Sequence, residues 1–565
     1  MQWFDRRIHF TGALDPIYWD EENEEIIFDQ FQTIYNDRQN FLEFIEYNCN
    51  IEPFTIQSQT QQSSHMSSSE ETLGTEKKRV RRILFSRSIP IDNGKLPVPN
   101  IVWPQPRYLN VSIDLVYIDP HKFIIDSSLK RCDVIDKAIE NYKAIFHPSK
   151  LNTHSLPDNI DEKQVLAMLS IEIKSNKCEK YPTFHVDESY SITIEQAYGK
   201  IQANTIWGAL HGLTTFSQLH FITDDIQLAI NAPITIEDEP RFPYRGILLD
   251  SGRNFLRTSV IKKHLGTVSS DHVYTLENVQ DIIEYARLRG IRIIPELNAP
   301  GHINALGRTF PDFLINCHSE STVGIIDPTN TEIYLFIEKI LREIKQIFEY
   351  ESYIHLGMDE VYSACCISNL NIQEFMIENR MSKCTDLMTY YSSAILEIVQ
   401  NIGAKPMVWQ DVWDDGVNLP LDVVIEIWKD ASWSTYLSKA INEGYNVVLA
   451  APFNLSMMSY RKYDESDSVM NAEFSKWYSI DLFGNFTGYK TARKRLIGGE
   501  ATLCGEFVDD INSLSRFWPR ASVVAEKLWS SSEMNNMEDV IVRFHVQRSR
   551  LFKLSMYQIN RSFFS

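Results

Sequence analysis

The sequence lacks several features that would assign a protein class at once. No apolar run approaches the roughly eighteen residues that a helix needs to cross a bilayer, so no membrane span is predicted. Positive charge is also scarce, because 55 Lys and Arg face 75 Asp and Glu, which gives a net charge of -20. Nucleic acid and anionic membranes attract basic patches, so neither is expected as the principal partner. Neutral or mildly charged ligands fit this composition better.

Metal-binding cysteine patterns are missing as well. The eight cysteines show no CxxC or His-rich spacing typical of zinc or redox sites, so neither a metal nor a cofactor is predicted. The first residues, Met1 to Asp5, lack the basic-then-apolar layout of a signal peptide, which by itself predicts a cytosolic start. Four Asn-x-Ser/Thr triplets are compatible with a secreted glycoprotein, and they lie at Asn110, Asn454, Asn485 and Asn560. These observations leave the compartment open.

The pattern of residues divides the chain into three parts, as expected for 565 residues. Residues 1–96 predict an irregular N-terminal extension that includes a Gln/Ser-rich linker. Residues 97–240 mix alternating strands with helical stretches and predict a small α+β domain. Residues 241–565 repeat short buried strands followed by amphipathic helices, which is typical of a parallel α/β sheet.

The third part predicts a catalytic barrel of the (β/α)8 TIM type. One of its helices has clear limits, because Thr275 can cap it, Ile282 and Ala286 belong to its apolar stripe, and Gly290 can end it. Seven strands are expected, at 245–250, 291–297, 353–357, 406–410, 423–428, 447–450 and 496–499.

The barrel lacks its second βα module in the sequence. The sixteen residues from Arg257 to His272 cannot hold a helix, a strand and two loops, since a βαβ unit needs roughly thirty residues. An open seam in a closed sheet would expose two strand edges and part of the core. Either the deletion is an artefact of the gene model, or residues 257–272 fill the gap and activity suffers.

Two adjacent carboxylates, Asp359 and Glu360, end the expected strand at 353–357. Parallel barrels present their chemistry at the C-terminal ends of the strands, so this pair is a candidate for catalysis. A negative charge raises the pKa of a carboxylic acid beside it, which suits one acid that donates a proton and one that stays ionised.

Eight short motifs follow one another in order: Trp103 to Pro106, Trp207 to Gln218, Phe242 to Gly246, Pro300 to His302, His355 to Glu360, Val408 to Gln410, Gly498 to Ala501 and Trp518 to Ala521. From about residue 97 to the end, the chain in this respect resembles the β-N-acetylhexosaminidases of glycoside hydrolase family 20. Any one motif is weak, but all of them in order are highly specific.

The resemblance implies a hydrolase that removes terminal non-reducing N-acetyl-β-D-hexosamine by a substrate-assisted retaining mechanism. In that reading Glu360 is the general acid, and Asp359 orients the acetamido group that acts as the nucleophile. Substrate-binding roles are implied for a further set of residues, namely Arg245, His302, Trp409, Trp428, Asn454 and Glu506. Glycans or glycoconjugates are the implied partners, and a homo- or heterodimer is compatible with the family.

The resemblance also implies disulfides between Cys132 and Cys178 and between Cys317 and Cys365, which favour a lysosomal or secreted protein over a cytosolic one. Several positions depart from the family pattern, namely Asn298, Met358, Asn454, Ser456 and Cys504. With the missing module, they support a second interpretation: a catalytically inactive relative that binds glycans or partners a competent subunit.

Overall fold

The computed structural model describes residues 6–11, 18–20, 25–27, 101–146, 156, 160–195, 197–223, 225–253, 256–258, 274–315, 324–361, 363–429, 432–456, 477–483, 486–534 and 536–553. The first three stretches are described as backbone only. All of them fall in one unit, made of Met1–Phe28 and Gly94–Ser565. Among the helices in these stretches, none is both long enough and apolar enough to cross a membrane.

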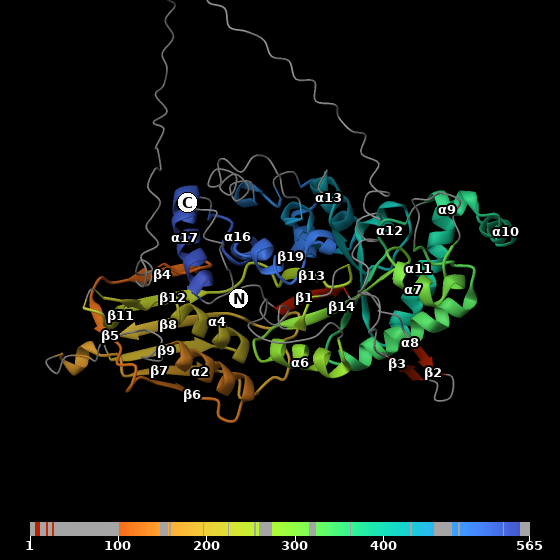
Figure 1. Cartoon of the computed structure of the whole chain (residues 1–565). Coiled ribbons are helices and arrows are strands. Elements are labelled where there is room, and N and C mark those ends of the chain that lie inside the picture. The colour runs from red at the N-terminus through yellow and green to blue at the C-terminus, as the bar shows by residue number, and fades with distance from the viewer. Residues whose placement is uncertain are drawn as a thin grey trace, which may run out of the picture. The chain divides into compact units, whose positions relative to one another are not determined.

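A closed barrel of parallel strands forms the larger part of this unit (Figure 1). Around the barrel the strands follow the order β1, β13, β19, β18, β17, β16, β15 and β14. The seven strands expected from the sequence are confirmed with small shifts at their ends, as β13 Tyr244–Asp250, β14 Arg292–Ala299, β15 Tyr353–Gly357, β16 Lys405–Trp409, β17 Val424–Ile427, β18 Asn446–Leu449 and β19 Leu496–Leu503.

The eighth strand, β1 (Arg6–Thr11), comes from the far N-terminus of the chain. It pairs in parallel with β13 on one side, where Ile8 faces Ile247, and with β14 on the other, where Ile8 faces Ile293. The expectation of an open seam is therefore corrected, and so is the expectation that residues 1–96 are irregular throughout. The physical reason is that two unpaired strand edges are costly, and β1 satisfies both of them.

Sequence reasoning missed β1 because it lies about 240 residues before the strand it pairs with, outside the βα rhythm on which the prediction rested. The described residues between β13 and the next helix, α6 (Leu276–Arg287), contain no strand. The sheet closes through β1, whether or not residues 259–273, which lie outside the described part, hold a further element. The sequence also predicts a short helix at 259–265, and this segment lies outside the described residues.

Helices cover the outside of the barrel. In α6 the Thr275 side chain accepts a hydrogen bond from the Asn278 backbone N–H, and Ile282 and Ala286 are buried, as the sequence predicts. The other helices that follow the β13 segment are α7 Asn304–Thr309, α8 Thr331–Ile347, α9 Ser363–Ser368, α10 Leu370–Glu378, α11 Cys384–Asn401, α12 Gln410–Asp414, α13 Trp433–Glu443, α15 Ser513–Phe517, α16 Arg520–Trp529 and α17 Met537–Lys553.

The interior of the barrel changes character along its axis. Near the N-terminal ends of the strands it is apolar, with Ile294, Met407 and Val448 in one buried cluster. Two residues further along β14, the buried inward position is Glu296, and His355 on β15 is buried beside it. The polar layer therefore lies directly below the ends of the strands where the paired carboxylates follow.

The smaller α+β part contains a six-stranded sheet with helices α2 (Asp133–Ile145) and α4 (Ile206–Phe216) over one face (Figure 1). Its strands are β4 Tyr108–Val111, β12 Ile234–Asp238, β8 Tyr190–Glu195, β9 Tyr198–Ala203, β7 Met168–Ile173 and β6 Ile124–Ser127. Two small sheets complete the list, formed by β10 Phe221–Ile222, β11 Leu228–Asn231 and β5 Leu115–Tyr117, and by β2 Tyr18–Asp20 and β3 Glu25–Ile27.

Two disulfides are present in the described residues. Cys132–Cys178 confirms the pairing implied by the family resemblance. Cys366–Cys384 joins α9 to the start of α11 and was not predicted. The other expected pair, Cys317–Cys365, falls on residues whose side chains lie outside the described part of the chain.

Candidate active site

The paired carboxylates lie in a sharply turned backbone at the end of β15. Gly357 has φ +69°, Met358 φ +66° and Glu360 φ +51°. Such angles are uncommon for residues other than glycine, and they cluster at functional sites where the surroundings hold them. Glycine is required at 357, because a Cβ there would lie 1.9 Å from the Asn298 Oδ1. The bulky Met358 fits nevertheless, because its side chain turns into the core and is 1 % exposed.

His302, for which the family resemblance implies a role in substrate binding, lies against both carboxylates. Its Nε2 is 3.4 Å from the Asp359 Oδ2 and 3.2 Å from the Glu360 Oε2. Hydrogen bonding to Asp359 raises the pKa of His302, although burial opposes the shift. The three ligand-type atoms lie within 4.8 Å of one another, so this group is also where a cation could bind.

The two carboxylates differ in exposure and in contacts. The Asp359 side chain is 12 % exposed and that of Glu360 is 38 % exposed. Asp359 Oδ1 is buried and has no hydrogen-bond partner among the described residues. A buried acceptor of this kind is costly unless a donor reaches it. Asp359 is therefore suited to receive a hydrogen bond from a bound molecule, and Glu360 to exchange a proton at the open mouth.

Two expected tryptophans form an apolar wall at neighbouring strand ends. Trp409, at the end of β16, and Trp428, just after β17, pack in one cluster with Leu248. The Trp409 Nε1–H donates to the Glu296 Oε1 at 3.2 Å. The Trp428 Nε1–H donates to an aspartate of α12, the Asp411 Oδ2, at 2.6 Å. These bonds fix both indole rings from behind.

Glu506 is exposed and pairs with an arginine that sequence reasoning missed. Its Oε1 is 3.1 Å from the Arg253 Nε. Arg253 follows β13 and also donates from Nη1 to the Asp250 Oδ2 at 2.6 Å. Asp250 in turn accepts a hydrogen bond from the Gly505 backbone N–H at 2.7 Å, which ties the loops after β13 and β19 together. Its position in the sequence was the available signal. Arg253 comes after the strand, at the end where parallel barrels place their sites, whereas Arg245 stands at the start of the strand.

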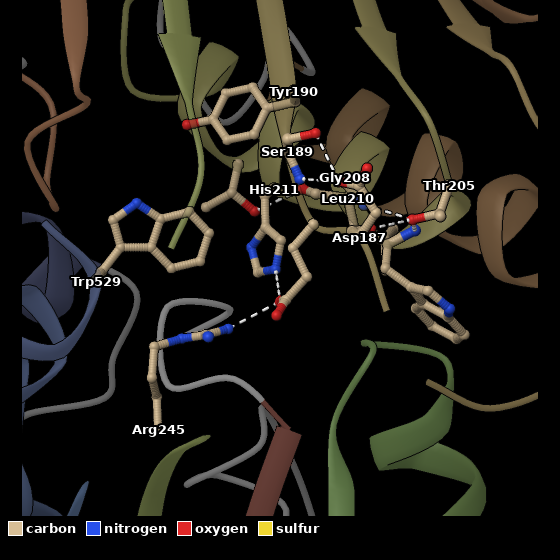
Figure 2. A network of polar contacts seen from close by, with 12 residues as sticks. Asp187, Ser189, Tyr190, Thr205, Gly208, Leu210, His211, Arg245 and Trp529 are labelled. Carbon is tan, nitrogen blue, oxygen red and sulfur yellow. Dashed lines mark hydrogen bonds and ion pairs between the residues drawn. The ribbon is translucent and has the colours of Figure 1, made fainter. Parts of the chain in front are cut away.

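Arg245 does not belong to this end of the barrel, which corrects its expected contact with sugar. It lies near the N-terminal end of β13 and is completely buried. Its Nη2 donates to the Glu188 Oε1 at 2.8 Å, and the same oxygen is 2.9 Å from the His211 Nε2 (Figure 2). The guanidinium carbon lies 4.9 Å from the ring centre of Trp529. Arg245 therefore joins the barrel to the smaller α+β part.

Asn454 lies after β18, at the same end of the barrel as the carboxylates, and its amide is used locally. The Asn454 Oδ1 accepts a hydrogen bond from the Ser456 backbone N–H at 2.8 Å. The Ser456 Oγ then accepts from the Cys504 backbone N–H at 2.8 Å. Burial raises the pKa of the Cys504 thiol to about 11, so the thiol stays neutral. Three of the altered positions, Asn454, Ser456 and Cys504, thus form a connected turn.

Comparisons with known proteins point the same way. A family model described as glycosyl hydrolase family 20, catalytic domain, matches residues 266–532, and one described as beta-acetyl hexosaminidase like matches residues 102–219. The chain is 34% identical over 494 residues to the beta-hexosaminidase subunit beta of Mus musculus, which covers 80% of this chain and 90% of that protein. The subunit alpha of Rattus norvegicus is 30% identical over 501 residues, covering 80% and 92%. A chitobiase from Flavobacterium johnsoniae superimposes with a TM-score of 0.68 at 23% identity, covering 81% of this chain and 73% of that chain.

Proposed function

Because the chain belongs to glycosyl hydrolase family 20, we propose that it is a β-N-acetylhexosaminidase. It removes terminal non-reducing N-acetylglucosamine or N-acetylgalactosamine from glycans or glycoconjugates. The single observation that carries the proposal is the pair Asp359 and Glu360. One carboxylate is nearly buried with an unbonded oxygen, the other is open, and His302 contacts both.

The proposed mechanism uses the substrate's 2-acetamido oxygen as the nucleophile. Glu360 protonates the leaving glycosidic oxygen as the acetamido oxygen attacks the anomeric carbon, which gives an oxazolinium-like intermediate. Asp359 accepts a hydrogen bond from the acetamido N–H and balances the positive charge that develops there. Glu360 then takes a proton from water, which attacks the anomeric carbon from the side that the leaving group vacated. The product therefore retains the β configuration.

Further side chains are proposed to bind the sugar. Trp409 and Trp428 provide flat apolar surface beside the carboxylates, which suits the methyl group of an acetamide and the face of a pyranose. Glu506 and Arg253 offer an acceptor and a donor for ring hydroxyls at the mouth. Asn454 is proposed at the edge of the same pocket, held in place by its turn.

The inactive interpretation loses one of its two supports. It rested on the missing module and on the substituted pocket positions, and the sheet closes through β1. The substituted positions at Asn454, Ser456 and Cys504 bond to one another rather than leave orphaned groups. Hydrolysis is therefore the function that the geometry supports better.

Compartment, assembly and domain limits are part of the same proposal. A lysosomal or secreted location is supported by Cys132–Cys178 and Cys366–Cys384, since disulfides persist in oxidising compartments. The two relatives described as subunits support a homo- or heterodimer. We propose domain limits at 97–240 and 241–565, with β1 of the 1–96 extension added to the second domain.

The test is release of phenol from aryl N-acetyl-β-glucosaminides by the purified chain and by Glu360→Gln. With a poor leaving group the variant should lose about 10³-fold in kcat/KM, because proton donation limits the reaction. With a dinitrophenyl leaving group, which needs little protonation, the loss should be much smaller. Glu338→Gln on the surface of α8, where Glu338 pairs with Arg342, is the matched control and should behave as wild type. A folded wild-type chain that hydrolyses neither substrate contradicts the proposal.

A further inference from the structure

The backbone that carries the two carboxylates turns sharply at the end of β15. Between Gly357 and Glu360, three of four residues have positive φ, so the turn does not form from local preference alone. Two hydrogen bonds donated by backbone N–H groups hold its start. The Met358 N–H donates to the Ala299 carbonyl at 3.2 Å, and the Gly357 N–H donates to the Nδ1 of His355 at 3.1 Å. One of the two anchors is therefore a side chain.

That side chain is enclosed within the barrel. His355 is fully buried, its ring packs edge-on to Trp409 with ring centres 4.9 Å apart, and its Nδ1 is 3.4 Å from the Glu296 Oε1. On its other side the Nε2 is 3.9 Å from the Glu426 Oε2. Side chains from β14, β16 and β17 thus fix the imidazole in one orientation.

The hydrogen bond from Gly357 also fixes the tautomer. A backbone N–H can only donate to a ring nitrogen that carries a lone pair, so Nδ1 is unprotonated and the ring proton is on Nε2, on the side of Glu426. Trp409 packs against the ring and Glu426 lies on its Nε2 side, so both suit a ring that presents the Nδ1 lone pair to the turn. Nothing in a purely apolar core position would require this arrangement.

We propose that His355 is a positioning residue for the reaction: its Nδ1 anchors Gly357 and thereby sets where Asp359 and Glu360 stand relative to the substrate. The inference rests on the proposed hydrolase function. His355 does not touch the substrate, because it is fully buried beneath the turn. Its effect should therefore be seen in kcat rather than in KM, since a small displacement of reacting groups costs rate.

Two matched variants separate this role from simple packing. In His355→Asn the side-chain oxygen can take the place of Nδ1 and accept from the Gly357 N–H. In His355→Gln the amide reaches the place of Nε2 instead and loses that bond. Both substitutions are polar and both leave a similar gap against Trp409, so they should destabilise the fold alike.

The measurement is kcat and KM on an aryl N-acetyl-β-glucosaminide, together with the melting temperature. We expect His355→Gln to lose about 100-fold in kcat with KM within about 3-fold, and His355→Asn to recover at least 10-fold of that loss. His211→Asn is the control, because His211 is a similarly buried histidine bonded to Glu188 at 2.9 Å and far from the turn. It should lower the melting temperature and leave kcat per folded molecule unchanged.

Equal kcat for His355→Asn and His355→Gln overturns the inference while leaving the proposed function intact. The same holds if His355→Gln keeps the wild-type kcat. A folded wild-type chain without activity overturns both this inference and the proposed function. That outcome is seen in the wild-type assay alone, before any variant is compared.

Discussion

The two ends of the barrel hold the same kinds of side chain in opposite surroundings. At the N-terminal end Glu188 and His211 meet Arg245, and the side chains of this group are at most 4 % exposed. At the C-terminal end His302 meets Asp359 and Glu360, with side chains 12 % to 38 % exposed. The first carboxylate has a permanent cation as partner, whereas the second pair has a titratable histidine and an unbonded oxygen. Burial and a fixed partner give a structural group, while exposure and incomplete bonding give a reactive one.

The comparison presupposes a closed barrel, so the largest effect should come from removing the strand that closes it. A chain without residues 1–28 loses β1 and leaves the edges of β13 and β14 unpaired. We expect the truncated chain to be insoluble or to lack a cooperative unfolding transition, as measured by yield and by thermal denaturation. A truncated chain that melts like the full one would show that β1 is dispensable for closure.

The next largest effect should distinguish the two carboxylate groups directly. Asp359→Asn keeps the size of the side chain and removes the charge that balances the acetamido group, so kcat should fall by about 10³-fold with little change in melting temperature. Glu188→Gln removes a buried charge beside Arg245 and should show the reverse, a lower melting temperature with kcat per folded molecule retained. Loss of kcat in Glu188→Gln would break the comparison.

The two arginines of the β13 segment, Arg253 and Arg245, provide a further test of the difference between the two ends of the barrel. Arg253→Ala at the open end should reduce kcat/KM by about 100-fold through loss of a charged hydrogen bond to the sugar, with a small effect on stability. Arg245→Ala at the N-terminal end should lower the free energy of unfolding by about 3–5 kcal/mol, because Glu188 stays buried without its cation. Urea denaturation and steady-state kinetics on both variants measure the two effects. If Arg245→Ala instead lowers kcat/KM in a stable protein, our correction of its role is wrong.

This pair of arginines also shows what the sequence could predict. The seven strands of the later chain, the α6 cap at Thr275 and the carboxylate pair with His302 followed from periodicity, capping chemistry and motif. Site residues at the C-terminal ends of strands were placed at the correct end of the barrel, because position along a strand decides the end at which a residue lies. Arg245 was misplaced because the family motif around it is specific for the family and says nothing about which end of the strand faces the ligand.

The remaining misses have a common cause, which is contact between residues far apart in the chain. β1 pairs with strands that no local pattern connects to it, and Cys366–Cys384 forms because α9 and α11 pack together. The turn at Gly357 depends on a histidine two residues away whose orientation is set by three other strands. Periodicity reports local structure, so features fixed by tertiary pairing lie beyond it.

The smallest expected effect is a dependence of stability on pH, and it comes from the N-terminal end of the barrel. Asp238 on β12 accepts hydrogen bonds from the Trp529 Nε1–H and the Tyr190 hydroxyl, both at 2.9 Å. Burial nevertheless raises the pKa of Asp238 from 3.8 to about 7, and burial raises the pKa of Glu526 to about 7 as well. The folded state therefore holds protons that the unfolded state releases, so stability is highest below the unfolded pKa and is lost as pH rises through about 7.

We accordingly expect the titration of Asp238 alone to lower the free energy of unfolding by roughly 2–3 kcal/mol between pH 5 and pH 8, measured by urea denaturation. The raised pKa values of Glu526 and His302 act in the same direction, so a variant is needed to assign an effect to Asp238. Asp238→Asn cannot titrate and should remove the Asp238 part of the dependence, leaving the part that comes from Glu526 and His302. If the variant and the wild type lose the same stability over this range, the pH dependence does not come from Asp238. A weaker pH dependence in the variant would mean that the junction between the barrel and the smaller part makes the fold more stable at acidic pH, independently of the end that holds Asp359 and Glu360.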